Sequence, residues 1–482
     1  MMRFQITRCA ARLCALTAVL GAALSGCSLA PLYVRPDAPV APSFVGDVSG
    51  TSRPASEIGW REFFPDARLQ RLIEAALRNN RDLRTAALRI DEARALYNVQ
   101  SADLLPNLNL NASESRARIP GSLTPSGNAV VTSSYQVGVS LASFELDFFG
   151  RVRSLNDAAL AQFLATAEAK QAAQLSLIGE VAKAYLAERG YAEQLALAQQ
   201  TLAGRQTAYD LAKQRFDVGA SSALDLRLSE TLVQSTRVTL ITLQRQRAQA
   251  ENALTMLVGQ ATPDLPAAPV LSDENIVTAI PAGVPSDLLT RRPDIRAAEQ
   301  RLKAANANIG AARAAFFPRI ALTAGLGTSS NALAGLFETG SRNWSFAPQL
   351  LLPIFDAGRN RSNLTLAQVR TRLAVVDYER TIQVAFREVS DALVARESLD
   401  AQTAAQAAVT AAQSARLSLA EQRFQNGIAS ALDVVDAQRD LFSAQQALVQ
   451  VRQLRLTNAV DLYRALGGGW SEVSGTAPVP AH

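Results

Sequence analysis

Two nearly identical stretches of fifteen residues constrain this chain more than any other feature of its sequence. Residues 211–225 read LAKQRFDVGASSALD and residues 419–433 read LAEQRFQNGIASALD, and ten of the fifteen positions are identical at an offset of 208. In each stretch a helical pattern runs up to a glycine, Gly219 or Gly427, and a serine three residues later begins another helical pattern. Glycine favours the end of a helix and serine its start, so each stretch predicts the tight tip of an antiparallel helical hairpin. A hairpin tip that occurs twice predicts two tandem structural repeats.

Residues 1–26 have the pattern of a signal peptide, which does not belong to the fold. Arginines precede an apolar core at 13–24 that is too short to span a membrane stably. The segment Leu24-Ser25-Gly26-Cys27 resembles a bacterial lipobox, which predicts cleavage before Cys27 and a covalent lipid on Cys27. Ser28, in the next position, favours the outer membrane. An ordinary signal peptide that happens to contain a cysteine is the alternative.

Composition and residue types argue against an enzyme and against a nucleic-acid-binding protein. The chain has 48 Lys and Arg against 43 Asp and Glu, and loss of the signal peptide with its three arginines lowers the formal charge from +5 to +2. Cys9 and Cys14 also leave with the signal peptide, so the mature chain keeps no pair of cysteines for a disulfide. The only histidine is His482, and the sequence has no metal-ligand spacing and no phosphate-binding loop. We therefore expect no catalysis, no cofactor besides the lipid, no metal and no nucleic acid.

The two predicted repeats have the same order of elements. A proline-rich tether at 27–65 precedes the first repeat, 66–259, which holds a helix, strands near 107–113 and 134–146, a long helix at 151–217 and a return helix at 222–258. A linker at 260–293 precedes the second repeat, 294–467, which holds a helix, strands near 319–327 and 343–353, a long helix at 359–425, a return helix at 430–466, and then a tail at 468–482. The short helix at 82–104 and the return helix at 222–258 are together nearly as long as the long helix. We therefore expect these two helices to stack end to end beside it.

The predicted fold is mainly helical, with strands that suit a membrane β-barrel. Four strands are too few to close a barrel, and lipid does not tolerate an open sheet edge. The strands have one apolar and one small polar face, so a barrel with a wet lumen would need several copies, and a trimer would supply twelve strands. A soluble, half-buried sheet is the alternative. The alanine-rich long helices favour a cylinder with a solvent-filled bore, and a long coiled coil without a channel is the alternative.

Specific motifs across nearly the whole mature chain carry a family resemblance. They are Cys27-Ser-Leu-Ala-Pro, Trp60-Arg-Glu-Phe-Phe, Asn80-Arg-Asp-Leu-Arg, the long runs at 283–298 and 304–318, both hairpin tips, and Leu466-Gly-Gly-Gly-Trp470. The chain resembles the outer-membrane efflux-duct family, which is TolC-like, and within it the OprM/NodT-type lipoproteins of RND efflux systems. The resemblance implies a homotrimer with a twelve-stranded β-barrel in the outer membrane of a Gram-negative bacterium and a periplasmic α-helical barrel. It also implies passive export, with a periplasmic adaptor and an inner-membrane transporter of the RND type, as in that family, as partners.

The same resemblance places functional residues at the two tips. The adaptor contacts it implies are Val218, Gly219, Ala220, Asn426, Gly427 and Ile428. The periplasmic entrance or gate it implies consists of Asp225, Asp433, Asp436, Phe424 and Arg423. The chain departs from TolC in two places, since Ala429 replaces a tip arginine and Phe424 replaces a tyrosine. Asp225 and Asp433 also fit a purely structural role in the first turn of a helix, whereas Asp436 lies too far along its helix for that role.

Two other functions compete with an exit duct. A periplasmic adaptor lipoprotein also carries a lipid anchor and a helical hairpin, but it has one hairpin flanked by β-rich domains, whereas this chain has two hairpins that each accompany a strand pair. A pump-independent porin would not need helical rods about 100 Å long. The exported substrates have no signature in the sequence.

Overall fold

The computed structural model describes residues 28–41, 44, 55–261, 265–272, 276–278, 280 and 285–474. The predicted signal peptide, Cys27 and the end of the predicted tail lie outside the described residues, as do parts of the predicted tether and linker. The chain divides into two compact units. We call the unit of residues 1–37, 90–166 and 298–378 the strand unit, and the unit of residues 38–89, 167–297 and 379–482 the tip unit. Each unit takes residues from both halves of the chain, so the units cut across the repeats that the sequence predicts.

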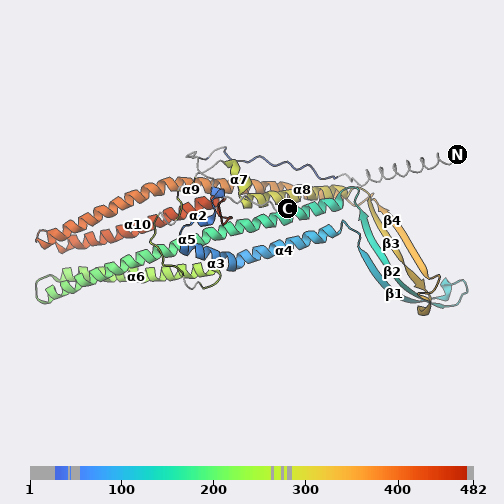
Figure 1. Ribbon diagram of the computed structural model, residues 1–482, viewed down its shortest axis with the longest axis horizontal. Coiled ribbons are helices and arrows are strands. Elements are labelled where there is room, and N and C mark those ends of the chain that lie inside the picture. The colour runs from blue at the N-terminus through green and yellow to red at the C-terminus, as the bar shows by residue number, and fades with distance from the viewer. Residues whose placement is uncertain are drawn as a thin grey trace. The chain divides into compact units, whose positions relative to one another are not determined.

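The strand unit contains one antiparallel sheet with strand order β1-β2-β3-β4 (Figure 1). The strands are β1 (Leu108–Ile119), β2 (Val130–Leu146), β3 (Arg319–Ser330) and β4 (Arg342–Leu351). The register aligns Leu110, Val139, Leu326 and Trp344 in one row across the sheet, so the apolar residues of all four strands share one face. The next row, which points to the other face, consists of Asn111, Gly138, Gly327 and Asn343.

The first two strands are longer than the sequence predicts. Strand β1 continues to Ile119 instead of ending near 113, and β2 begins at Val130 instead of near 134. The residues from Glu114 to Arg118 are mostly polar and lack apolar alternation, but each is paired with a residue of β2. Here the hydrogen-bonded ladder, and not the hydrophobic pattern, sets the strand ends.

Long helices make up most of the remaining structure. They are α5 (Arg151–Asp217), α6 (Ala223–Val258), α9 (Arg359–Gln425) and α10 (Ala431–Ala465). The shorter helices are α2 (Trp60–Phe63), α3 (Ala67–Asn79), α4 (Arg81–Ala102), α7 (Pro285–Arg291) and α8 (Pro293–Ala314). Helix α7 was not expected, because the sequence predicts an irregular linker there. No helix in the described part of the chain combines the length and the apolar character needed to cross a bilayer.

The return helices meet the short helices end to end, as their lengths predict. The Asn80 side chain donates to the carbonyl of Leu257 at 2.8 Å, which joins the end of α6 to the start of α4. Gly259 has a φ of 81° and lies so close to Asn79 that a Cβ would be 2.5 Å from the Asn79 carbonyl oxygen. At the end of α10, Arg292 donates to the carbonyl of Ala465 at 3.0 Å, beside the start of α8. The end of each return helix therefore contacts the start of a short helix.

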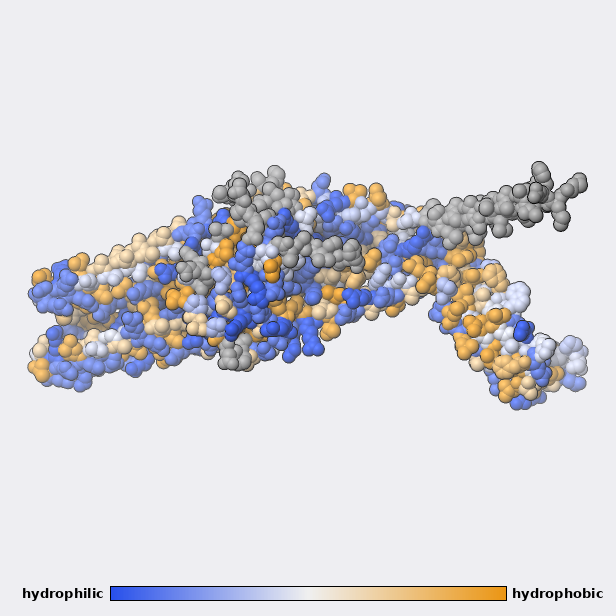
Figure 2. Space-filling view, viewed as in Figure 1, coloured by the Kyte–Doolittle hydropathy of each residue, from blue (hydrophilic) through white to orange (hydrophobic). Residues whose placement is uncertain are grey.

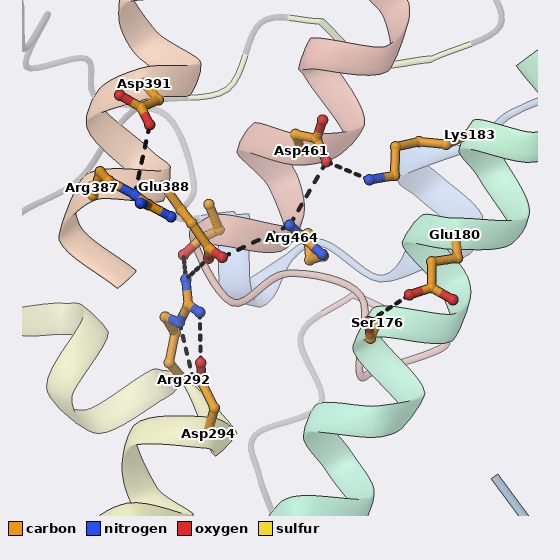
Figure 3. Close-up of polar contacts among 11 residues, drawn as sticks. Ser176, Glu180, Lys183, Arg292, Asp294, Arg387, Glu388, Asp391, Asp461 and Arg464 are labelled. Atoms are coloured by element: carbon orange, nitrogen blue, oxygen red, sulfur yellow. Dashed lines mark hydrogen bonds and ion pairs between the residues drawn. The ribbon is translucent and has the colours of Figure 1, made fainter. Parts of the chain in front are cut away.

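Arg292 is also the centre of an ion-pair network in the tip unit (Figure 3). It is 8% exposed and lies 2.6 Å from Asp294 and 2.9 Å from Glu388 of α9. Nearby, Asp461 of α10 accepts from Lys183 of α5 at 3.0 Å. This network links four helices from both halves of the chain.

The N-terminal segment is extended, as a tether would be, but it is not free. The carboxylate of Glu299 in α8 accepts from the Arg35 guanidinium at 2.8 Å and from the Tyr33 hydroxyl at 3.2 Å. Arg313 and Asn306 of α8 donate to the carbonyls of Leu29 and Pro31, respectively. A Cβ on Gly310 would lie 2.8 Å from Ala30, so the segment lies directly against the helix. Residues 28–37 are therefore docked along α8.

Candidate functional site

The two hairpin tips have the same backbone structure. In the second tip, Ile428 N–H donates to the Arg423 carbonyl at 2.8 Å and Gly427 N–H donates to the Phe424 carbonyl at 3.0 Å. This pair of bonds is a Schellman motif, which requires a left-handed residue after the helix, and Gly427 has a φ of 72°. The first tip repeats the arrangement, with donors Ala220 and Gly219 and a φ of 74° at Gly219. The sequence repeat therefore encodes one turn twice.

Apolar side chains project from both tips. Val218 is 78% exposed and Ile428 is 68% exposed, beside the two tip glycines. No atom lies within 4 Å of a Cβ built on Gly219 or Gly427. Each tip therefore exposes one large apolar side chain beside its glycine.

Two of the predicted gate aspartates cap helices. The Ser430 side chain accepts from the Asp433 N–H, while Asp433 Oδ2 accepts from the Ser430 N–H and hydroxyl at 2.9 Å each. Ser222 and Asp225 form the same capping box at the start of α6. The hydrogen bonds from Ser430 lower the pKa of the Asp433 carboxyl below its ordinary value. Both carboxylates therefore stabilise the start of a helix in their own hairpin.

Asp436 does not cap a helix, and it has an ionic partner that the sequence prediction missed. Arg439, one turn further along α10, lies 3.1 Å from Asp436 and 3.1 Å from Asp440. Asp440 in turn pairs with Arg416 of α9 at 2.7 Å. The spacing of three residues between Asp436 and Arg439 could have predicted the first pair. A row of alternating charge therefore follows Asp436 along the second hairpin.

The remaining predicted gate residues, Arg423 and Phe424, end the long helix of the second hairpin. The positive charge of Arg423 also contributes to the lowered pKa of Asp433, after the hydrogen bonds from Ser430. Phe424 lines a cavity of about 420 Å³ between the two hairpins, and Asp225 lines the same cavity. The structure thus brings Phe424 and Asp225 to one cavity, together with Arg205, which the sequence prediction missed because a single arginine in a long helix has no local signature.

Comparison with known proteins shows which protein family and which solved structures this chain resembles. The model of the outer membrane efflux protein family matches the chain twice, at residues 72–260 and 284–468. Outer membrane protein OprJ of Pseudomonas aeruginosa is 48% identical over 452 residues, which are 93% of this chain and 94% of that protein. Toluene efflux pump outer membrane protein TtgF of Pseudomonas putida is 46% identical over 470 residues, 95% of this chain and 97% of that protein. The structure of the open state of the Neisseria gonorrhoeae MtrE outer membrane channel matches with a TM-score of 0.87 and 43% identity over 93% of this chain and 100% of that one.

Proposed function

The chain belongs to the outer membrane efflux protein family, and on this premise we propose that three copies form one exit duct for substrates expelled by an inner-membrane pump. The chain is an outer-membrane channel of an efflux system in a Gram-negative bacterium. It is neither an enzyme nor a periplasmic adaptor. The trimer, its barrels, its partners and its gate are the parts that we propose.

The single observation that carries the proposal is the exposed apolar face of the sheet. In one row, Leu110 is 78% exposed, Val139 46%, Leu326 71% and Trp344 78%. Figure 2 shows hydrophobic residues gathered over the strands. Such a face is costly in water and favourable in lipid, while the asparagine, serine and glycine rows of the opposite face suit a wet lumen.

The edges of the sheet favour three copies. In the described part of the chain, β1 and β4 each pair with one strand only, so their outer edges have free N–H and C=O groups. Lipid does not tolerate such edges, and four strands cannot close on themselves. Pairing of β1 of one copy with β4 of the next would close a barrel, and three copies would give twelve strands. The two matches of one family model support the proposal of two structural repeats in each copy.

Disulfide cross-linking tests this closure directly. After removal of the signal peptide only the lipidated Cys27 would remain, so introduced cysteines have no competing free thiol. Cysteines at Asn109 or Asn111 of β1 are combined with cysteines at Asn343 or Ser345 of β4, and the membranes are oxidised. We expect at least one combination to link copies into trimers. A cysteine pair at Gln136 and Ser329, which are partners within the sheet, is the control and should link only within a chain. Links confined to single chains in every combination would overturn the proposal.

The tips support a docking role for the other end of the duct. The relatives are named as outer membrane proteins of efflux pumps, which implies that other pump components meet this chain. We place the contact with a periplasmic adaptor at Val218, Gly219 and Ala220 of the first tip and at Asn426, Gly427 and Ile428 of the second. The exposed side chains of Val218 and Ile428 would supply the apolar part of that contact. The adaptor would join the duct to an inner-membrane transporter of the RND class.

The gate we propose lies just behind these tips. In a trimer, Asp436 would occur three times around the axis, and like charges close together repel and attract cations. Asp225 and Asp433 would support the gate by fixing the starts of α6 and α10. Arg423 and Phe424 lie at the end of α9, the long helix of the second hairpin. The ion pair to Arg439 offsets part of the charge of Asp436.

The lipid anchor remains part of the proposal. Acylation of Cys27 would begin one residue before the described N-terminal segment, whose Leu29 and Pro31 carbonyls are bound by α8. That short distance would hold the acyl chains close to the end of α8. We propose that the docked segment fixes the height at which the lipid enters the membrane, besides attaching the protein to it.

A further inference from the structure

A cavity between the two hairpins has the chemistry of a binding site that the exit-duct function does not use. Its volume is about 420 Å³, which lies in the range of small-molecule sites. Residues from both hairpins line it, and those of α5 extend from Arg205 to Arg215, about 15 Å of helix. All lining residues belong to the tip unit.

Large apolar side chains line much of the cavity, beside the neutral polar residues Ser229, Ser430 and Gln438. Leu232 of α6, Phe424 of α9 and Val434 and Val435 of α10 contribute large side chains, and Ala212 of α5 leaves space between them. Comparison of the two hairpins at the offset of 208 shows how they differ at two lining positions. The second hairpin has the ion pair between Arg416 and Asp440 at the positions that correspond to Ala208 and Leu232, two lining residues. The first hairpin therefore lacks a polar bridge where the second hairpin has one.

Within the part of the chain that the structure describes, a buried cation without an acidic partner lines this space. Arg205 is 6% exposed, and its guanidinium donates to the Thr236 hydroxyl at 2.5 Å and to the carbonyls of Leu232 and Gln438 at 3.4 Å and 3.3 Å. Its remaining close neighbour is the Phe442 ring, at 5.2 Å. All these partners are neutral, and the Nε atom is buried without a hydrogen-bond partner. Burial alone lowers the pKa of Arg205, with no acidic group acting on it.

The other polar groups of the cavity also favour an anion. The Ser221 hydroxyl is buried without a hydrogen-bond partner. Arg215 lines the cavity from an exposed position. The one lining carboxylate, Asp225, accepts hydrogen bonds from Ser222 in its capping box. Two arginines thus face one carboxylate that is already hydrogen-bonded.

We propose that this cavity binds a small amphipathic carboxylate, with its anionic group at Arg205 and its apolar chain against Leu232, Phe424 and Val434. Arg205 supplies the charge-assisted hydrogen bonds, because a buried guanidinium gains most from an acceptor that carries charge. The apolar walls supply the rest of the affinity by removing the chain from water. The ligand contacts α5 and α6 on one side and α9 and α10 on the other, so it joins the two hairpins. This inference goes beyond the exit-duct function and does not depend on it.

Decanoate is a suitable compound for the test, measured by titration calorimetry on the full chain in lipid nanodiscs, with empty nanodiscs as the background. We expect saturable binding above that background. Arg205→Gln should weaken decanoate binding about tenfold or more, since it removes the hydrogen bonds to a charged group. Ala212→Phe, which fills the cavity and keeps Arg205, should weaken it at least as much. Arg237→Gln is the matched control, because Arg237 is exposed on α6, donates to Gln234 and does not line the cavity.

Binding of the uncharged decanamide separates the contribution of the charge at Arg205 from that of the apolar walls. It should bind the original chain more weakly than decanoate does, and Arg205→Gln should change its affinity little. If Arg205→Gln does not assemble, Ala212→Phe still decides the result. Uptake that matches empty nanodiscs would overturn the proposal, and so would decanoate affinity that neither Arg205→Gln nor Ala212→Phe lowers.

Discussion

Replacement of Gly427 by alanine isolates the cost of the tip backbone. Gly427 has a φ of 72°, and a Cβ there meets no atom within 4 Å. The penalty is therefore conformational and not steric, and a left-handed alanine costs about 1–2 kcal/mol. Opening of the Schellman motif avoids this cost and releases the hydrogen bonds from Gly427 and Ile428. We expect the opening equilibrium of the tip to rise about 5- to 30-fold.

Hydrogen exchange of the tip peptides measures this opening, since exchange of the Ile428 amide follows the open population. Gly427→Ala should accelerate exchange by that factor, and Gly427→Asn should restore most of the protection, because asparagine tolerates the left-handed region. Gly204→Ala is the control: Gly204 lies inside α5 with open space around it, so alanine should stabilise the helix by about 0.5–1 kcal/mol and leave the tip unchanged. Unchanged exchange in Gly427→Ala, or equal acceleration by asparagine, would refute the reasoning. If asparagine restores the tip but not transport, the adaptor requires a bare glycine surface.

Four further predictions address the anchor, the gate and the helix contacts. Cys27→Ser should abolish labelling with radioactive palmitate, and persistent labelling would contradict the lipobox. We expect two changes to the gate, Asp436→Asn and the double replacement Asp433→Ala with Asp436→Ala, to raise single-channel conductance in planar bilayers and to weaken block by multivalent cations. Unchanged conductance and block in the double variant would exclude the gate. Glu299→Ala should increase the mobility of a spin label at Val34, which is 75% exposed, because Arg35 and Tyr33 lose their shared acceptor; a label at Val473 serves as the control. Arg292→Met should lower the free energy of unfolding by about 1–3 kcal/mol, less than for a fully buried pair because Asp294 and Glu388 are 37% and 29% exposed. Thermal unfolding measures that loss. Arg387→Met should cost much less, because Arg387 is 70% exposed; Figure 3 shows it paired with Asp391.

The long helices could be predicted from the sequence because glycines mark their ends. Gly150 and Gly358 have φ values of 72° and 84° and directly precede α5 and α9. The tip glycines follow the same helices, so the bounds at 151–217 and 359–425 agree with the structure. Glycine at a left-handed position is a local signal, and local signals survive in a single sequence.

The features that the sequence did not reveal depend on distant partners. Residues 28–37 look like a free tether because nothing nearby in the sequence indicates that Glu299 binds Arg35. The extension of β1 past 113 depends on pairing with β2, although its own residues are mostly polar. The same limit applies to the site. The motif placed Asp225 and Asp433 at the tips, but the structure was needed to find that Arg205 lines the same cavity as Asp225, with only neutral hydrogen-bond partners.

The two hairpins share a turn, but they differ in how their helices are held together behind it. At the offset of 208, Asp436 and Arg439 correspond to Leu228 and Thr231, and Arg416 and Asp440 correspond to Ala208 and Leu232. The second hairpin therefore has ion pairs between and along its helices at four positions where the uncharged residues of the first hairpin form none. Just behind the tip, the Arg416–Asp440 pair joins the two helices of the second hairpin, and the corresponding residues of the first hairpin are Ala208 and Leu232. Salt should therefore weaken the contact between the helices at this level more in the second hairpin than in the first. In the gate that we propose, control of the entrance would depend on the residues by which the two copies of the turn differ, while the turn itself depends on those they share.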